Sequence, residues 1–305
     1  MPFVLLGCVG LVWGISYPIT ALALNGFDVL TLRCVIQTLG ACAMLAQAAA
    51  LRRGFAVERE AWSDLVVAAL LNMTVLPLSF TIGVYLLGPG RTSVLVYTMP
   101  IWAALFARIV LGERLTVARG VALAFGAGAV AALMSQNLPE LRNAPLGGAV
   151  TLLAAMSYGL GTVWLKRRVW RADAAVVVLW QLLIGTIPIL AAWFWLRFPV
   201  DLARVTAAQW LAAAFLGVVG NGVAYFAWFR VIALLPAGAA GIGTLITPCI
   251  AVISSVWLAG ETLHPHDVAA VALIGTALLL VMVEQLRTRR RSVALRAGPG
   301  RTASL

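Results

Sequence analysis

The sequence predicts an all-α integral membrane protein with ten transmembrane helices, arranged as two inverted repeats of five helices each. Three observations lead to this fold class: a very apolar composition, ten apolar runs of membrane-spanning length, and two helix-length segments that match at one fixed offset. The first two indicate a polytopic membrane protein, and the third divides it into halves.

The composition is that of a membrane protein. Hydrophobic residues make up 62% of the 305 residues and charged residues 11%, whereas a soluble domain is about half apolar and about a quarter charged. The net charge of +11 does not indicate nucleic-acid binding, because the basic residues gather in short connections, where they set orientation. The four cysteines lie in apolar runs without metal-ligand spacing, so they are interpreted as packing residues.

Ten apolar runs have roughly the 18–25 residues that an α-helix needs to cross the hydrocarbon core. The first begins at Phe3 without a basic segment before it, so it is interpreted as a span and not as a cleavable signal peptide. The connections are too short to hold a soluble domain. The predicted spans cover residues 3–24, 28–51, 64–87, 90–111, 117–135, 145–166, 174–197, 208–232, 238–259 and 265–286.

The basic residues predict the orientation of these spans. With the N-terminus inside, seventeen of the 22 Lys and Arg residues fall on the cytoplasmic side and four on the outer side, with Arg33 inside a span. The positive-inside rule therefore predicts a multi-pass membrane protein with both termini in the cytoplasm.

Two segments, 91–115 and 239–263, match at an offset of 148 positions, which aligns Pro100 with Pro248 and the Gly-Glu pair at 112–113 with that at 260–261. Proline inside a helix removes a hydrogen bond, and in a bilayer the freed carbonyl must face protein or a water-filled cavity. Paired interruptions of this kind point to a transport site. The predicted units are residues 1–138, residues 139–286 with inverted topology, and a basic cytoplasmic tail at 287–305, which is expected to be disordered.

These features resemble the EamA-type members of the drug/metabolite transporter (DMT) superfamily over essentially the whole chain. The resemblance is carried by ten spans, Trp13-Gly14 in the first, Arg33 in the second, and a Gly-Glu pair ending the fourth and ninth. Residues 97–102 (YTMPIW) and 158–164 are most similar to YddG-type exporters of aromatic and other amino acids. The resemblance implies a central cavity inside spans one to four and six to nine, and amino-acid export by alternating access.

Aromatic and amide residues deep in the predicted spans, together with the two matched prolines, form the candidate lining of this cavity. An aromatic set suits an amphipathic substrate, through ring stacking with its side chain and a cation–π contact with its ammonium group. Each aromatic residue alone is more often a packing residue, and a buried amide serves equally well to join helices. The candidate lining residues are Trp13, Asn72, Tyr97, Pro100, Trp102, Tyr158, Trp164, Asn221, Tyr225 and Pro248.

Arg33 is the one charged residue that lies away from the ends of a predicted span, about one and a half turns from the outer end of span two. Two interpretations remain open for it. The guanidinium is suited to hold a substrate carboxylate by bidentate hydrogen bonds. The structural interpretation, which is the commoner one, is that it reaches the interface, bonds helix-end carbonyls or pairs with Asp28 at the start of the same span.

Carboxylates and histidines are missing from the deep parts of the predicted spans. The small multidrug relatives of this superfamily carry a membrane-embedded glutamate in span one for proton exchange, and this sequence has none there. We therefore expect transport without an intramembrane carboxylate proton relay. A phosphate carrier would need several buried basic side chains, and only Arg33 is available.

The alternative for the same fold is an exporter of another small metabolite or drug, because a fold does not determine a substrate. A membrane enzyme would need a nucleophile with a base, paired acids or metal ligands at one depth. The lack of carboxylates and histidines deep in the predicted spans argues against this alternative. A scaffold or sensor is disfavoured by the matched interrupted helices. No cofactor, metal or nucleic acid is expected; the expected partners are small-molecule amino acids and the lipid bilayer, for a monomer or a weak homodimer.

Overall fold

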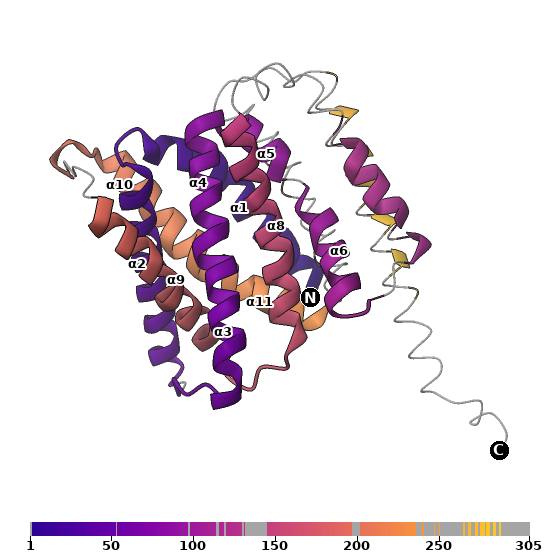
Figure 1. Ribbon diagram of the computed structural model, residues 1–305, viewed down its shortest axis with the longest axis horizontal. Coiled ribbons are helices and arrows are strands. Elements are labelled where there is room, and N and C mark those ends of the chain that lie inside the picture. The colour runs from indigo at the N-terminus through magenta and orange to yellow at the C-terminus, as the bar shows by residue number, and fades with distance from the viewer. Residues whose placement is uncertain are drawn as a thin grey trace, which may run out of the picture.

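The computed structural model describes residues 2–52, 54–96, 98–113, 116–118, 120–129, 131, 145–196 and 202–235, and scattered residues between 240 and 287. Every regular element in this part of the chain is a helix (Figure 1). The elements are α1 (Pro2–Leu24), α2 (Val29–Ala50), η1 (Arg59–Ala61), α3 (Trp62–Ala69), η2 (Leu70–Val75), α4 (Leu76–Leu87), α5 (Pro89–Val96), α6 (Met99–Val110), α8 (Pro145–Arg167), α9 (Ala174–Leu196), η3 (Leu202–Arg204), α10 (Ala207–Ala214), η4 (Phe215–Val223) and α11 (Ala224–Leu234).

Six helices are long and apolar enough to cross a membrane, and they coincide with six of the ten predicted spans. The six are Val4–Leu24, Val29–Ala50, Arg59–Leu87, Pro145–Arg167, Ala174–Leu196 and Ala207–Leu234. A shorter apolar helix, Gly120–Ala129, lies within predicted span five. Predicted span nine falls almost wholly outside the described residues, and predicted span ten is described only at scattered residues, which are helical.

Predicted span four is divided into two short helices, α5 and α6. Pro100 lies in the first turn of α6, where a missing N–H costs nothing within that helix. Because Pro100 cannot donate, the carbonyl of Val96, four residues earlier, receives no ordinary helical hydrogen bond from it. The interruption that the proline predicts is therefore present. Pro248, its partner in the predicted repeat, lies outside the described residues.

Two of the six long helices contain a π-helical segment. In Arg59–Leu87 the segment is η2, and in Ala207–Leu234 it is η4. An offset of 148 positions carries η2 onto residues 218–223, inside η4. A π-helical turn widens the helix and redirects its carbonyls, and such turns are frequent at functional sites.

Local chemistry defines the helix ends. The carboxylate of Asp28 accepts hydrogen bonds from the backbone N–H groups of Leu30 and Thr31, each at 3.0 Å, and so caps α2. Gly112 follows α6 with φ of 65°, a left-handed conformation that glycine adopts without strain. The Gly-Glu pair at 112–113 thus ends a helix, as predicted.

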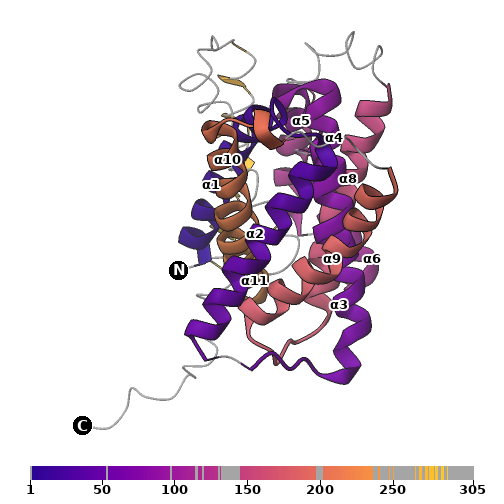
Figure 2. The same cartoon turned by 90° about the vertical axis from the view of Figure 1, so that its left-hand side faces the viewer.

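The helices form one bundle with two recognisable ends (Figures 1 and 2). At the basal end α1, α3 and α9 begin while α2, α8 and α11 finish; α5 and α10 lie toward the opposite end. In the interior α2 packs against α9 and η4, α9 against η2, and α8 against α4 and α6. The two π-helical segments therefore lie against the central helices α2, α8 and α9.

Gly217 provides a test of the contact between α2 and η4. An added Cβ would lie 2.7 Å from the carbonyl oxygen of Ile36 and 2.7 Å from Cβ of Leu39. Because one of these neighbours is backbone, Gly217→Ala should cost about 1–3 kcal/mol of stability by overpacking. The thermal unfolding midpoint in detergent measures this loss. The matched control is Gly7→Ala, which has nothing within 4 Å and should leave the midpoint unchanged or slightly raised; an equal effect of both changes would contradict the close contact.

Candidate functional site

A cavity of about 120 Å³ lies inside the bundle. Since one water needs roughly 10–15 Å³ of such space, the cavity has room for on the order of ten water molecules. It extends from the middle of the bundle toward the end opposite the basal end. Its walls are Trp13, Ser16, Tyr17, Thr20, Arg33, Leu76, Pro77, Phe80, Val96, Met99, Pro100, Tyr158, Leu216, Gly220, Asn221, Tyr225 and Thr247.

The structure brings six residues singled out from the sequence to this cavity: Trp13, Arg33, Pro100, Tyr158, Asn221 and Tyr225. They come from α1, α2, α6, α8, η4 and α11, so both predicted halves contribute. Tyr97 and Pro248 lie outside the described residues, and their predicted place in the lining stays a prediction.

Three further candidates are not among the lining residues. The amide of Asn72 is buried one layer behind the cavity and donates to Oε1 of Gln181 at 3.3 Å. Trp102 packs against Phe106, with ring centroids 6.3 Å apart, and its indole N–H donates to the Thr98 hydroxyl. The guanidinium of Arg167 lies 4.8 Å from the ring centre of Trp164.

On α1 the sequence analysis identified Trp13 but not Ser16, Tyr17 and Thr20, which lie on the same face of the helix. Trp13, Ser16, Tyr17 and Thr20 all line the cavity, and their spacing of three and four residues places them on one side of a helix. Leu76, Pro77 and Phe80 form a similar stripe on α4. Polar residues recurring at helical spacing in an otherwise apolar span are the signal that could have identified the α1 face.

An aromatic cluster closes the cavity on its basal side. Trp13, Tyr158, Tyr225 and Trp228 form it, and the ring centroid of Trp13 lies 6.2, 5.4 and 5.7 Å from those of the other three, in that order. Tyr158 and Trp228 are 5.6 Å apart. Trp228 is only 2% exposed and lies one turn beyond Tyr225 on α11, so the spacing of three residues places both on one side of the helix.

Side chains from other helices satisfy the carbonyls of the π-helical segments. The amide of Gln37 donates to the Met73 carbonyl at 2.7 Å, and the hydroxyl of Ser157 donates to the Leu71 carbonyl at 2.8 Å. In η4 the carbonyl of Gly220 accepts from the indole N–H of Trp13 at 3.5 Å. Such bonds between membrane helices contribute about 0.6–2 kcal/mol each, so the widened turns are held by the helices around the cavity.

A buried polar layer continues behind the cavity between α2, α9 and the first π-helical segment. The hydroxyl of Thr186 donates to Oε1 of Gln37 at 2.9 Å, and that of Thr74 donates to the Gly185 carbonyl at 2.7 Å. The Tyr225 hydroxyl donates to the Asn72 carbonyl at 3.3 Å, which links the cavity wall to this layer. Gln37 and Asn72 join helices, whereas Asn221 lines the cavity.

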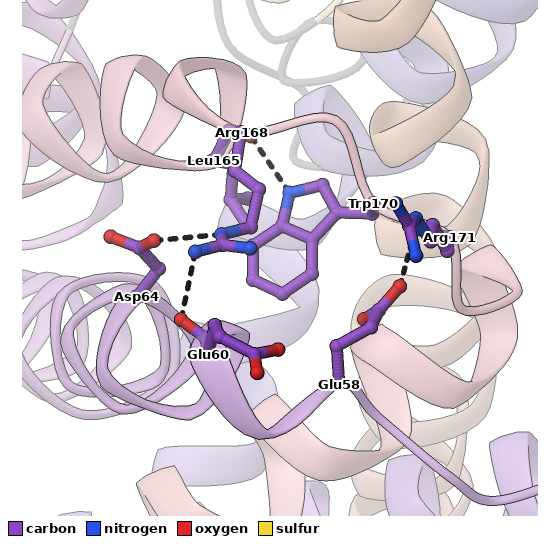
Figure 3. Close-up of polar contacts among 7 residues, drawn as sticks. All are labelled: Glu58, Glu60, Asp64, Leu165, Arg168, Trp170 and Arg171. Atoms are coloured by element: carbon purple, nitrogen blue, oxygen red, sulfur yellow. Dashed lines mark hydrogen bonds and ion pairs between the residues drawn. The ribbon is translucent and has the colours of Figure 1, made fainter.

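A set of polar contacts at the basal end ties the start of α3 to the connection between α8 and α9 (Figure 3). The Arg168 guanidinium forms an ion pair with Asp64, with Nε 2.9 Å from Oδ2, and also donates to the carbonyl of Glu60 at 2.7 Å. The backbone N–H of Arg171 donates to the Glu58 carboxylate at 3.1 Å. These contacts are called the basal clamp.

Lys166 forms a second set of hydrogen bonds between helices at the basal end. Its ammonium donates to the carbonyls of Ile232 and Leu235, at 2.6 and 2.8 Å. Ile232 lies in the last turn of α11 and Leu235 directly follows the helix, where carbonyls lack an ordinary helical partner. A cation is favourable at a helix C-terminus, so Lys166 holds the ends of α8 and α11 together below the aromatic cluster.

Apolar helices of spanning length around a buried cavity define a multi-pass membrane protein. The sequence model of the EamA-like transporter family matches residues 1–135 and 145–283 of this chain. The chain therefore belongs to that family. Members of the family are transporters, so the membrane-enzyme alternative is excluded.

Individual relatives are distant. The uncharacterized transporter YvbV of Bacillus subtilis (strain 168) is 26% identical over 296 residues, which cover 95% of this chain and 94% of the relative. A probable terminal-alkyne amino-acid exporter of Streptantibioticus cattleyicolor is 26% identical over 299 residues, with 95% and 94% covered. The fold resembles a solved crystal structure with a TM-score of 0.72 at 19% identity, covering 91% of this chain and 96% of that one.

Trp228 provides a test of the aromatic cluster. Trp228→Ala removes a side chain that is 2% exposed and contacts both Trp13 and Tyr158. The void should cost about 3–5 kcal/mol of stability, measured as the midpoint of unfolding by SDS in mixed micelles. Trp195→Ala is the control, because Trp195 is 86% exposed. A midpoint equal to that of the control would show that the cluster is not packed.

Proposed function

We propose that this chain exports amino acids, aromatic ones in particular, across the bacterial inner membrane by alternating access. The observation that carries the proposal is a cavity with five aromatic side chains and a single charged residue in its described lining. Aromatic walls suit an apolar side chain, and one cation suits one carboxylate. The probable terminal-alkyne amino-acid exporter of Streptantibioticus cattleyicolor, similar over 95% of this chain, supports amino acids as the substrate class. The preference for aromatic ones is supported by the resemblance of residues 97–102 and 158–164 to YddG-type exporters.

The proposed architecture is ten spans in two inverted halves, residues 1–138 and 139–286, followed by the basic tail. Support comes from the two π-helical segments, which overlap at the offset that aligns Pro100 with Pro248. The family's sequence model also matches two separate segments, 1–135 and 145–283, which correspond to the two proposed halves. An odd number of spans in each half inverts the second half, so the axis relating them lies in the membrane plane.

The proposed orientation makes the basal end cytoplasmic. Arg52, Arg59 and the basic run at 166–168 gather at this end, and short cytoplasmic loops carry such an excess of Lys and Arg. Both termini are then cytoplasmic. In this orientation the basal clamp, Lys166 and the aromatic cluster block the cavity from the cytoplasm, and release of substrate is toward the outside.

Transport by alternating access requires the basal end to open while the other end closes. The structure supplies candidate points of movement in the break between α5 and α6 and in the π-helical segments, because these places lack continuous α-helical hydrogen bonding. The described lining of the cavity contains no Asp, Glu or His. Transport is therefore proposed to need no carboxylate proton relay within the cavity.

Uptake of labelled tryptophan by purified protein in liposomes tests this function. We expect uptake above that of empty liposomes, and a rate that does not change with an imposed pH gradient. Uptake that follows the gradient would contradict the absence of proton coupling. No uptake above empty liposomes would contradict the amino-acid assignment and favour another metabolite or a drug on the same fold.

Tyr225→Ala should lower this uptake by roughly tenfold, because the variant loses a ring contact and a hydrogen bond that together contribute about 1–2 kcal/mol. Tyr85→Ala is the matched control, since Tyr85 is 67% exposed and lies outside the described cavity lining. Equal rates in the two variants, at equal amounts of folded protein, would remove Tyr225 from the site.

The basal clamp should limit opening of the basal end. Arg168→Gln removes a partly exposed ion pair worth about 1 kcal/mol, which should raise the population of the open form about fivefold. Spin labels at Leu51 and Val169, in a chain without its four native cysteines, report the change as a longer pairwise distance by pulsed electron paramagnetic resonance. Arg59→Gln, at an exposed position of the same end, is the control. Identical distance distributions would show that the clamp does not hold this end.

A further inference from the structure

Arg33 is buried, and in the described part of the chain it has neither the ion-pair partner nor the carbonyl contacts that a structural role predicts. The residue is 4% exposed and lines the cavity, and its Nε is buried with no hydrogen-bond partner. Asp28, the nearest acidic residue in the sequence, directs its carboxylate to the N–H groups of Leu30 and Thr31. Among the described residues no carboxylate lies within ion-pair distance of the Arg33 guanidinium.

An unpaired guanidinium inside a membrane bundle is costly, because burial removes water and nothing replaces it. Arginine cannot shed the charge by deprotonation at physiological pH. Of the seventeen lining residues that the structure describes, Arg33 alone carries a full charge. An anion that enters the cavity would offset this charge, which the described lining leaves unpaired.

Three other lining side chains have no hydrogen-bond partner among the described residues: the amide nitrogen of Asn221 and the hydroxyl oxygens of Thr20 and Thr247. An amide N–H₂ is a donor, and each hydroxyl can donate. Together with Arg33 they line one cavity with donors for an anion. No lining residue in the described part of the chain is a carboxylate that would hold an ammonium group by an ion pair.

We infer that the cavity recognises its substrate by the carboxylate, held by Arg33 with Asn221 and the two threonines, and does not require an ammonium group. The inference rests on the proposed function and narrows its substrate class to monocarboxylates with an aromatic or apolar body. N-acylated amino acids and aryl carboxylates belong to this class. Amino-acid amides and aromatic amines do not.

Binding to purified protein in nanodiscs tests the inference directly. The probes are tryptophan, N-acetyltryptophan and tryptophanamide at equal concentrations, and the measurement is the rise in the thermal unfolding midpoint. We expect both acids to raise the midpoint, with dissociation constants within about threefold of each other, and the amide to leave it unchanged. An amide that stabilises the protein as much as the acids do would overturn the inference.

Variants separate a ligand-binding arginine from a structural one. Arg33→Gln should abolish stabilisation by the acids while leaving the ligand-free midpoint equal or higher, because it removes an unpaired buried charge. A structural arginine would instead lower the ligand-free midpoint when replaced. The matched control is Arg230→Gln, since Arg230 is exposed and stacks on Phe226 at 5.1 Å, outside the described lining. If Arg33→Gln does not fold, Arg33→Lys keeps the charge and loses the bidentate fork, and should weaken acid binding about tenfold.

The outcomes distinguish this inference from the proposed function. Binding of N-acetyltryptophan without binding or uptake of tryptophan would refute amino-acid export and leave carboxylate recognition standing. Uptake of tryptophan at the wild-type rate by Arg33→Gln would leave the export function standing and refute carboxylate recognition by Arg33. Equal stabilisation of the wild type and Arg33→Gln by the acids would refute it as well.

Discussion

A bilayer offers no hydrogen bonds to a polypeptide, so every backbone carbonyl that leaves its helical partner must find another one inside the protein. This constraint organises the interior of the bundle. In the widened turns at 70–75 and 215–223, Gln37, Ser157 and Trp13 donate to backbone carbonyls from other helices. The polar side chains of the core thus serve the backbone first, and the cavity lies between the helices that they hold together.

The same scarcity of polar partners gives the cavity its chemical character. Amides such as Gln37 and Asn72 are already engaged and cannot serve a ligand. Arg33 and Asn221 are not engaged in this way. Hydrogen bonding therefore separates the amides that join helices from the polar residues that face the cavity. Burial alone would not separate them, because all four residues are less than a tenth exposed.

Composition and run length predict six of the spanning helices with bounds within a few residues, because the requirement for about 20 apolar residues is independent of tertiary structure. The face that each helix turns inward is harder to predict. Lipid and protein core are equally apolar, so an apolar span lacks the contrast that reveals a buried face in a soluble helix. No sequence pattern distinguishes Trp228, which faces the cluster, from Trp102 and Trp164, which lie outside the described lining. The π-helical segments depend on partners distant in sequence, which no local pattern contains.

Each π-helical turn holds one residue more than the α-helical turn it replaces, so the helix beyond it is turned by about 100° relative to an uninterrupted helix. A helical wheel drawn through Ala207–Leu234 therefore misplaces α11 relative to α10. The length of η4 is accordingly part of how Tyr225 and Trp228 come to face Trp13. Loss of one residue from this segment would keep the composition of the span and rotate its aromatic residues toward other neighbours, so chain length here constrains sequence divergence as strictly as residue identity does.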